Sequence, residues 1–243
     1  MRTLPVGTTS AAVRSFAGAQ GLSIEQVRRR LRDYRGHRTE GTEDEALRLE
    51  SWFESLESSA RRRHGERGET PTVTGTFVHE FALTIETRDG TRTLAAIARG
   101  GFSLWPEHEL GIYHGRAADA DFFASAVAQA ASGNPDGWNY LRLTGNQLRQ
   151  IRARSVNIRG VGYRQNPDPF VQKMAYSGSN VDQSSEVRRA DRRAVLHRIT
   201  IEIQVGSGKR TIQLMGSGNM LGFGCIQADF EDLTDVIEEV MRG

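Results

Sequence analysis

The sequence is poor in features that define several common classes of protein. It contains one cysteine, Cys225, which excludes an internal disulfide framework and fits a reducing compartment. No apolar run approaches the ~20 residues that a membrane-spanning helix needs, so we expect no membrane partner. The opening residues 1–13 lack the apolar centre of a secretory signal, which favours a cytoplasmic protein.

Recognisable catalytic chemistry is also missing. The glycine-rich passage 216–224 does not have the order of a phosphate-binding loop, because Lys209 precedes the glycines, and it is expected to be a turn or bulge. The His and Glu residues at 79–80 and 107–114 match no known metal-ligand spacing. Cys225 lies in an apolar setting with no His beside it, which predicts a core residue. We therefore expect no catalytic residue, no metal and no other cofactor.

The chain has concentrated blocks of charge instead, although its net charge is only +2. Residues 2–38 hold eight Arg against two acids, and residues 39–60 hold seven acids against one Arg. A second basic block, 138–165, has six Arg and no acid. Concentrated positive charge suits phosphate-rich partners. The alternative is that blocks of opposite sign neutralise each other inside the fold.

Two helices are predicted in the first basic block. Ser10 is a candidate N-cap for a helix over about 11–20, which Gly21 can end in a left-handed conformation. Ser23 begins a second helix, and Gln26 three residues later completes a capping box. Its apolar stripe has helical spacing and consists of Ile24, Val27, Leu31 and Tyr34.

This pair of helices resembles a helix-turn-helix DNA-binding motif over residues 12–34. Ala17, Gly21, Val27 and Leu31 occupy the places of the small residue, the turn glycine and two core aliphatics. The resemblance implies that the helix from Ile24 is the recognition helix. The side chains nearest DNA would then include Gln26, Arg28, Arg29, Arg32 and Arg35. A structural or protein-binding helical bundle is the alternative interpretation.

A third helix is predicted from the capping box of Thr42 and Glu45 to about His64. Together the three helices would form a helix-turn-helix-like module over residues 1–66. The segment 65–70 (GERGET) is the best candidate for a domain boundary.

The expected body, residues 71–243, alternates between strand and helix patterns and has possible sub-units 71–135 and 138–243. Alternation over 73–98 around an Arg-Asp-Gly turn predicts a hairpin, followed by a helix over about 119–132. The same order returns with a hairpin over 199–215 and a helix over 229–241. The expected fold class is α+β, a three-helix module followed by a body with two antiparallel hairpin–Gly–helix units. Duplication and chance use of common turns both explain the repeat.

The second basic block is a candidate nucleic-acid surface. Its arginines alternate with Trp138, Tyr140 and Tyr163, as a surface that follows phosphates and stacks on bases requires. A solvated face, or a contact with the acidic segment 43–57, is an equal alternative. The candidate residues are Arg142, Arg149, Arg152, Arg154, Arg159 and Arg164.

These patterns lead to two hypotheses about function. The first is a non-enzymatic nucleic-acid-binding protein in which the N-terminal module binds duplex DNA and residues 142–164 add a second basic surface. The second is a structural, assembly or protein-interaction subunit, for example of a phage-like particle or a multi-protein complex, whose basic blocks meet acidic partners. The partners we expect are nucleic acid, a second copy of the chain in a homo-oligomer, or a larger protein assembly. An enzyme of unrecognised type is a third possibility.

Overall fold

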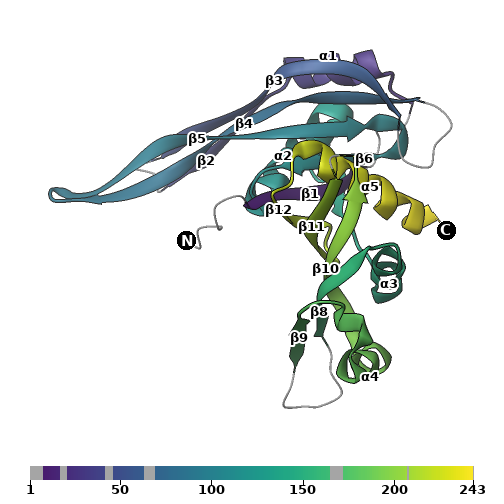
Figure 1. The fold of residues 1–243 in the computed structure, drawn as a ribbon. Coiled ribbons are helices and arrows are strands. Elements are labelled where there is room, and N and C mark those ends of the chain that lie inside the picture. Colours follow the sequence, from purple (N-terminus) through teal and green to yellow (C-terminus); the bar gives the residue numbers. More distant parts are fainter. Residues whose placement is uncertain are drawn as a thin grey trace. The chain divides into compact units, whose positions relative to one another are not determined.

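The computed structural model describes residues 8–16, 21–41, 46–62, 69–164, 172–206 and 208–242. Within these ranges it has twelve β-strands and five α-helices, and every strand register that is defined is antiparallel (Figure 1). None of these helices is long and apolar enough to cross a membrane. The expected fold class is therefore wrong: antiparallel sheet dominates, and no three-helix module precedes an α+β body.

The chain divides into two compact units: of the described residues, those in 8–14 and 140–242 and Arg62 belong to unit 1, and those in 15–61 and 69–139 belong to unit 2. The expected boundary at 65–70 falls mostly outside the described residues. In unit 2 the strands pair in the order β2-β3-β4-β5-β6. Its elements are α1 (Ile24–Asp33), β2 (Arg35–Glu40), β3 (Leu47–Arg62), β4 (Glu69–Thr87), β5 (Gly90–Trp105), the short 3-10 helix η1 (Pro106–His108), β6 (Leu110–His114) and α2 (Ala117–Ser132).

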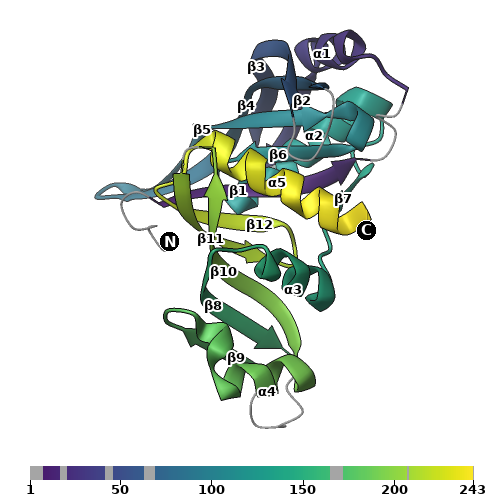
Figure 2. The same ribbon diagram turned by 45° about the vertical axis from the view of Figure 1, so that its right-hand side comes forward.

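In unit 1 the strands pair in the order β1-β12-β11-β10-β8-β9. Helices α3 and α4 lie beside β8 and β10 (Figure 2). The elements that begin or lie in this unit are β1 (Thr8–Phe16), α3 (Gly145–Ala153), β8 (Asn157–Arg164), β9 (Lys173–Ser177), the 3-10 helix η2 (Val181–Gln183), α4 (Ser185–Arg193), β10 (Val195–Val205), β11 (Gly208–Met215), β12 (Asn219–Phe223) and α5 (Gln227–Arg242). Strand β7 (Trp138–Tyr140) lies at the point where the chain passes from unit 2 to unit 1.

The first predicted helix is a strand as far as it is described. Residues 11–16 belong to β1, and Ala11 to Arg14 are at most 1% exposed. A central strand that is buried on both faces has an apolar run without alternation, which resembles a helical pattern in sequence. The rest of that predicted helix, 17–20, lies outside the described residues.

The third predicted helix is also a strand where it is described, β3, and its predicted capping box at 42–45 lies outside the described residues. Its apolar spacing changes at Ser55, whose φ of 51° lies in the left-handed region. Phe53 and Leu56 both turn at least partly inward although three residues separate them, because the irregularity at Ser55 breaks the alternation. This step of three produced the apparent helical stripe. Pairing with β2, which runs from Arg35↔Trp52 to Glu40↔Leu47, overrides the helix propensity of the Glu residues.

Several other elements confirm their local sequence signals. Helix α1 begins after Ser23, whose hydroxyl accepts the Gln26 N–H while the Gln26 side chain accepts the Ser23 N–H. The first hairpin turns between Thr87 and Gly90, and Gly90 has a φ of 118° that favours glycine. The second hairpin turns between Val205 and Gly208.

Aromatic rings form the centre of unit 2. Phe123 of α2 contacts Phe53, Phe77, Phe102 and Tyr113, with ring centroids 5.3–6.4 Å apart. Burying each large aromatic side chain contributes roughly 1.5–3 kcal/mol. Helix α2 is therefore fixed on the face of β4 and β5 that carries Phe77 and Phe102.

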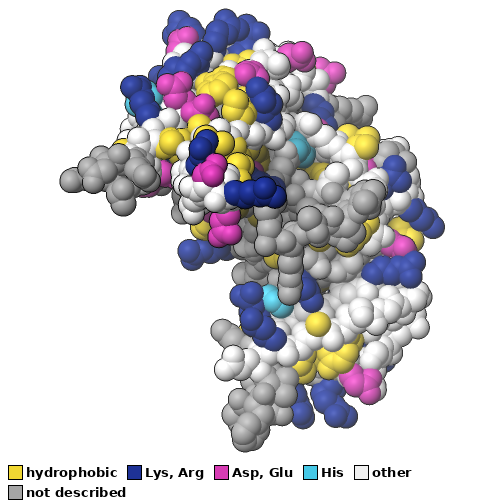
Figure 3. Space-filling model, turned by 90° about the vertical axis from the view of Figure 1, so that its left-hand side faces the viewer, with side chains coloured by type: hydrophobic (Ala, Val, Ile, Leu, Met, Phe, Trp, Pro, Cys, Tyr) yellow, Lys and Arg dark blue, Asp and Glu magenta, His cyan; other side chains and the backbone are white. Residues whose placement is uncertain are grey.

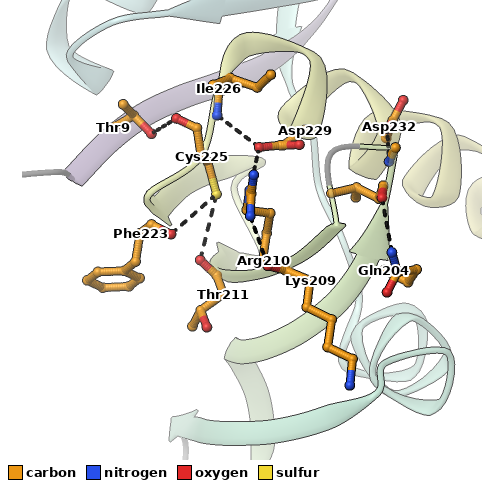
Figure 4. A network of polar contacts seen from close by, with 12 residues as sticks. Thr9, Gln204, Lys209, Arg210, Thr211, Phe223, Cys225, Ile226, Asp229 and Asp232 are labelled. Atoms are coloured by element: carbon orange, nitrogen blue, oxygen red, sulfur yellow. Dashed lines mark hydrogen bonds and ion pairs between the residues drawn. The ribbon is translucent and has the colours of Figure 1, made fainter.

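A polar network fixes the start of α5 in unit 1 (Figure 4). The fully buried Asp229 accepts hydrogen bonds from the Ile226 N–H (2.9 Å) and the Arg210 Nε–H (3.1 Å). Cys225 lies beside it, 5% exposed, and burial raises the pKa of its thiol to about 11. This confirms the prediction of a core cysteine.

Candidate interaction surfaces

The arginines of α1 form a surface of their own. Gln26, Arg28, Arg29 and Arg32 line a shallow surface depression together with Glu25, while Val27 and Leu31 on the other face of the helix are buried. Glu25 neutralises Arg28 at 2.7 Å. The structure therefore brings four of the five predicted residues together, with part of their charge compensated.

The fifth residue, Arg35, does not belong to this helix face. It begins β2, and its guanidinium donates to the backbone carbonyls of Arg32 (3.2 Å) and Tyr34 (2.7 Å). Arg30 donates to the Ala131 carbonyl at the end of α2. The helix that should precede α1 in a helix-turn-helix motif is replaced by β1 where the chain is described, so α1 lacks the supporting element of that motif.

The second basic block is largely neutralised within unit 1, and Asp191 of α4 is the centre of the largest group. Arg152 binds both carboxylate oxygens of Asp191, at 2.6 and 3.3 Å, and Tyr163 donates its hydroxyl to the same carboxylate at 2.9 Å. Arg149 donates to the Asp191 backbone carbonyl at 2.7 Å. Burial opposes ionisation of Asp191, but the hydrogen bonds from Arg152 and Tyr163 outweigh it and lower its pKa below the ordinary value. This cluster fastens α4 to α3 and β8.

Two further arginines of the block have acidic partners. Arg154 pairs with Glu239 of α5 at 2.8 Å, and Arg159 binds Glu202 of β10 with two nitrogens at 2.7 and 2.9 Å. Four of the six predicted arginines are therefore paired in the fold. Arg142 and Arg164 are exposed and form no ion pair with a carboxylate in the described residues.

An apolar surface that the sequence did not predict lies on the β4–β5 hairpin, which projects from unit 2 (Figure 1). Leu83 of β4 and Leu94 of β5 are directly opposite each other and are 43% and 52% exposed. Ile85, two residues further along the same face, is 39% exposed. In the upper part of Figure 3, hydrophobic side chains lie among charged ones on the surface. We call Leu83, Ile85 and Leu94 the apolar strip.

The apolar strip continues the core-facing side of β4. Alternate side chains of a strand share a face, so Phe77, His79 and Phe81 lie in one row with the strip. Helix α2 covers the beginning of this row: Phe123 contacts Phe77, and Phe122 stacks on His79 at 5.4 Å. The row therefore passes from buried to exposed where the covering helix ends.

A polar cluster marks the end of that cover. The His79 Nε2 lies 3.4 Å from Oδ1 of Asp119, and Arg116 binds both oxygens of Asp119, at 2.9 and 3.1 Å. Burial opposes ionisation of Asp119, but these contacts lower its pKa. The Arg116 guanidinium lies over Phe81, 5.4 Å from the ring centre. The cluster anchors the start of α2, and no member but Arg116 is exposed.

The hairpin also leaves one edge of β5 uncovered. Strand β6 pairs with β5 only from Gly101 to Trp105. Residues Gly90 to Gly100 pair with β4 on one side, and no described strand pairs with their other side. An edge strand with an apolar centre and no proline is open to pairing with another chain.

No three His, Cys, Asp or Glu side chains are grouped as a metal site would require in the described ranges. Neither a family model nor a curated protein matches the sequence.

Proposed function

We propose that the chain is a non-enzymatic interaction protein whose β4–β5 hairpin binds a protein partner. One observation carries this proposal: the row from Phe77 to Ile85 has the alternation of a buried sheet face, yet its outer half is uncovered. A strand exposed to water on both faces has no need for apolar residues at every second position.

Covering the strip offers a useful free energy of binding. A fully buried Leu or Ile side chain contributes roughly 1.5–3 kcal/mol, so residues that are about half exposed contribute about 1 kcal/mol each when covered. Pairing of a partner segment with the open edge of β5 would satisfy backbone groups in addition.

The charges around the strip favour a partner of complementary charge over a second copy of the chain. Arg92 lies opposite Ile85 on the strip face, and Arg88 is in the adjoining turn. Two copies joined through this face would bring these cations together, whereas a partner with an apolar stripe bordered by carboxylates would pair with them.

A matched pair of double variants tests the proposal. Leu83→Asp with Leu94→Asp places two charges on the strip, and Thr84→Asp with Thr93→Asp places them one residue away on the opposite face, where the two hydroxyls are 3.4 Å apart. Each protein is expressed at native level in the cells that encode it, and co-purifying proteins are quantified by mass spectrometry. Circular dichroism checks the fold of both variants.

We expect the strip variant to lose a defined partner that the threonine variant keeps. Equal retention in both variants, or equal loss, would overturn the proposal. Light scattering on the isolated chain adds the homo-oligomer test: a dimer that only the strip variant abolishes would make a second copy the occupant.

The nucleic-acid hypothesis expects a helix over 11–20 before α1, whereas residues 11–16 belong to strand β1, and four of the six arginines of its second block have acidic partners. It remains a proposal for a different group of cations in unit 1.

A further inference from the structure

The two faces of strand β8 carry opposite kinds of charge environment. Tyr163 points to the face where α4 supplies Asp191. Arg164, the next residue, belongs to the other face, and its register partner across the β8–β9 pair is Lys173. Like charges directly opposite each other in a sheet repel and destabilise the pair.

Two more side chains join this group around Gly162. His197 Nδ1 lies 2.7 Å from the Gly162 carbonyl oxygen and so donates to it. A Cβ on Gly162 would come within 3.0 Å of His197 Cε1 and 3.1 Å of Arg198 Nε. The missing side chain at Gly162 thus lets the imidazole and a third cation lie against β8, beside Arg164.

The group has no acidic counterpart among the residues that the structure describes. Arg164, Lys173 and Arg198 form no ion pair with a carboxylate in the described part of the chain. Burial and the three cations lower the pKa of His197, and only its hydrogen bond to Gly162 opposes them. The potential at this site is strongly positive, because three cations lie beside the imidazole of His197 with no described anion among them. In the lower part of Figure 3, a His side chain lies beside Lys and Arg side chains.

The surrounding residues add to this potential. The described residues within 142–206 contain twelve Lys and Arg against four Asp and Glu. Two of those acids, Asp191 and Glu202, are already bound by arginines. Arginines on α4, which packs on the other face of β8, supply further exposed cations of unit 1: Arg188, Arg189, Arg192 and Arg193.

We infer that Arg164, Lys173 and Arg198 bind the phosphate backbone of a nucleic acid, and that the imidazole of His197, whose Nδ1–H is already donated to Gly162, lines the site. The surplus of positive charge extends well beyond one anion, and a nucleic-acid strand carries a phosphate at every nucleotide. The guanidinium groups of Arg164 and Arg198 have the planar fork that binds phosphate oxygens in pairs. This site is independent of the hairpin.

The test compares two double variants that remove the same charge. Arg164→Ala with Lys173→Ala removes the like-charge pair, whereas Arg88→Ala with Arg92→Ala removes two exposed cations of unit 2. Fluorescence polarisation measures binding of labelled single-stranded RNA, single-stranded DNA and duplex DNA at about 50 mM and about 200 mM salt. Polyglutamate serves as a competitor of protein-like charge.

We expect the first variant to weaken binding at least about tenfold at low salt. Its log–log salt slope should fall by about 1.4 on single strands or about 1.8 on duplex, since each lost phosphate contact removes about 0.7 or 0.9. The second variant should bind like the wild type.

Equal weakening in both variants, or no binding by the wild type, would overturn the inference. Competition by polyglutamate as strong as that by unlabelled nucleic acid would overturn it in favour of an acidic protein partner. The strip variant Leu83→Asp with Leu94→Asp should keep nucleic-acid binding, which separates this result from the fate of the proposed function.

Discussion

Arginines border the two faces of β8 in two different states. On one face Arg149 and Arg152 are held by Asp191, and on the other Arg164 lies opposite Lys173 without a carboxylate in the described residues. The first group is part of the fold and the second is open to a ligand. Counting arginines along the chain does not distinguish them, because the acids that neutralise the first group come from distant segments.

The first group has a stabilising role and the second has the binding role that we propose, so a change to each group should have a different consequence. The chain offers separate probes for its two units. Cys225 is a buried thiol of unit 1, and all three tryptophans, Trp52, Trp105 and Trp138, are in unit 2. Thiol labelling during urea unfolding therefore follows unit 1, and tryptophan fluorescence follows unit 2.

Removal of the Asp191 carboxylate should have the largest effect. Asp191→Ala leaves the guanidinium of Arg152, whose side chain is 12% exposed, without its partner. Loss of one member of a buried ion pair destabilises by about 3 kcal/mol, and we expect about 2–4 kcal/mol here. The urea midpoint for Cys225 labelling should fall, and the midpoint for tryptophan fluorescence should stay in place.

Asp182→Ala is the control, because Asp182 forms no ion pair with an arginine in the described residues. An equal fall in both variants would show that the Asp191 cluster is not what fastens α4.

Acid should weaken the same cluster through protonation. The pKa of Asp191 is lowered in the fold, so the unfolded chain takes up the proton first. The stabilisation is complete above the unfolded value of about 3.9 and is lost as the pH falls through the folded value. Cys225 labelling by an acid-tolerant disulfide reagent, in urea series from about pH 6 to about pH 2, measures the loss.

Asp191→Asn has no such proton to gain and should show a flatter pH dependence of the unit 1 midpoint. Parallel curves for the wild type and Asp191→Asn would contradict the assignment.

The smallest effect on stability should come from the open face, with the opposite sign. Lys173→Glu turns the repulsive pair with Arg164 into an attractive one and should stabilise unit 1 by about 0.2–1 kcal/mol. The same change should abolish nucleic-acid binding. Lys173→Gln removes the repulsion only and should fall between the wild type and Lys173→Glu in stability. A loss of stability in Lys173→Glu would mean that Lys173 has a structural role.

Local signals in the sequence were reliable where one short segment decides the conformation. The capping box at Ser23 begins a helix, and the turns before Gly90 and Gly208 both close hairpins. Each depends on contacts within a few residues.

Predictions failed where the conformation depends on distant pairing. Strand β1 pairs with β12 from the other end of the chain, as its register from Thr8↔Phe223 to Ala12↔Asn219 shows. The irregularity at Ser55 gave β3 the spacing of a helix.

The same distinction explains the outcome for the candidate residues. The basic blocks were visible in the sequence, but the acids that pair with them were not predictable. Arg152 pairs with an Asp 39 residues away, and Arg159 pairs with a Glu 43 residues away. The apolar strip was part of a correctly predicted hairpin. The alternation of apolar and polar residues shows that one face of the hairpin is apolar, but it does not show which element covers that face.

The register of the β4–β5 hairpin also sets an order of events in time. Its pairs run from Thr87↔Gly90 to Val73↔Leu104, so the ends can zip together from the turn with little loop to close at each step. Hairpins of this kind form in about 1–10 μs, far faster than pairings such as β1 with β12. A newly made chain thus presents its apolar strip before its termini have met. A partner that arrives during synthesis would find its binding surface already complete.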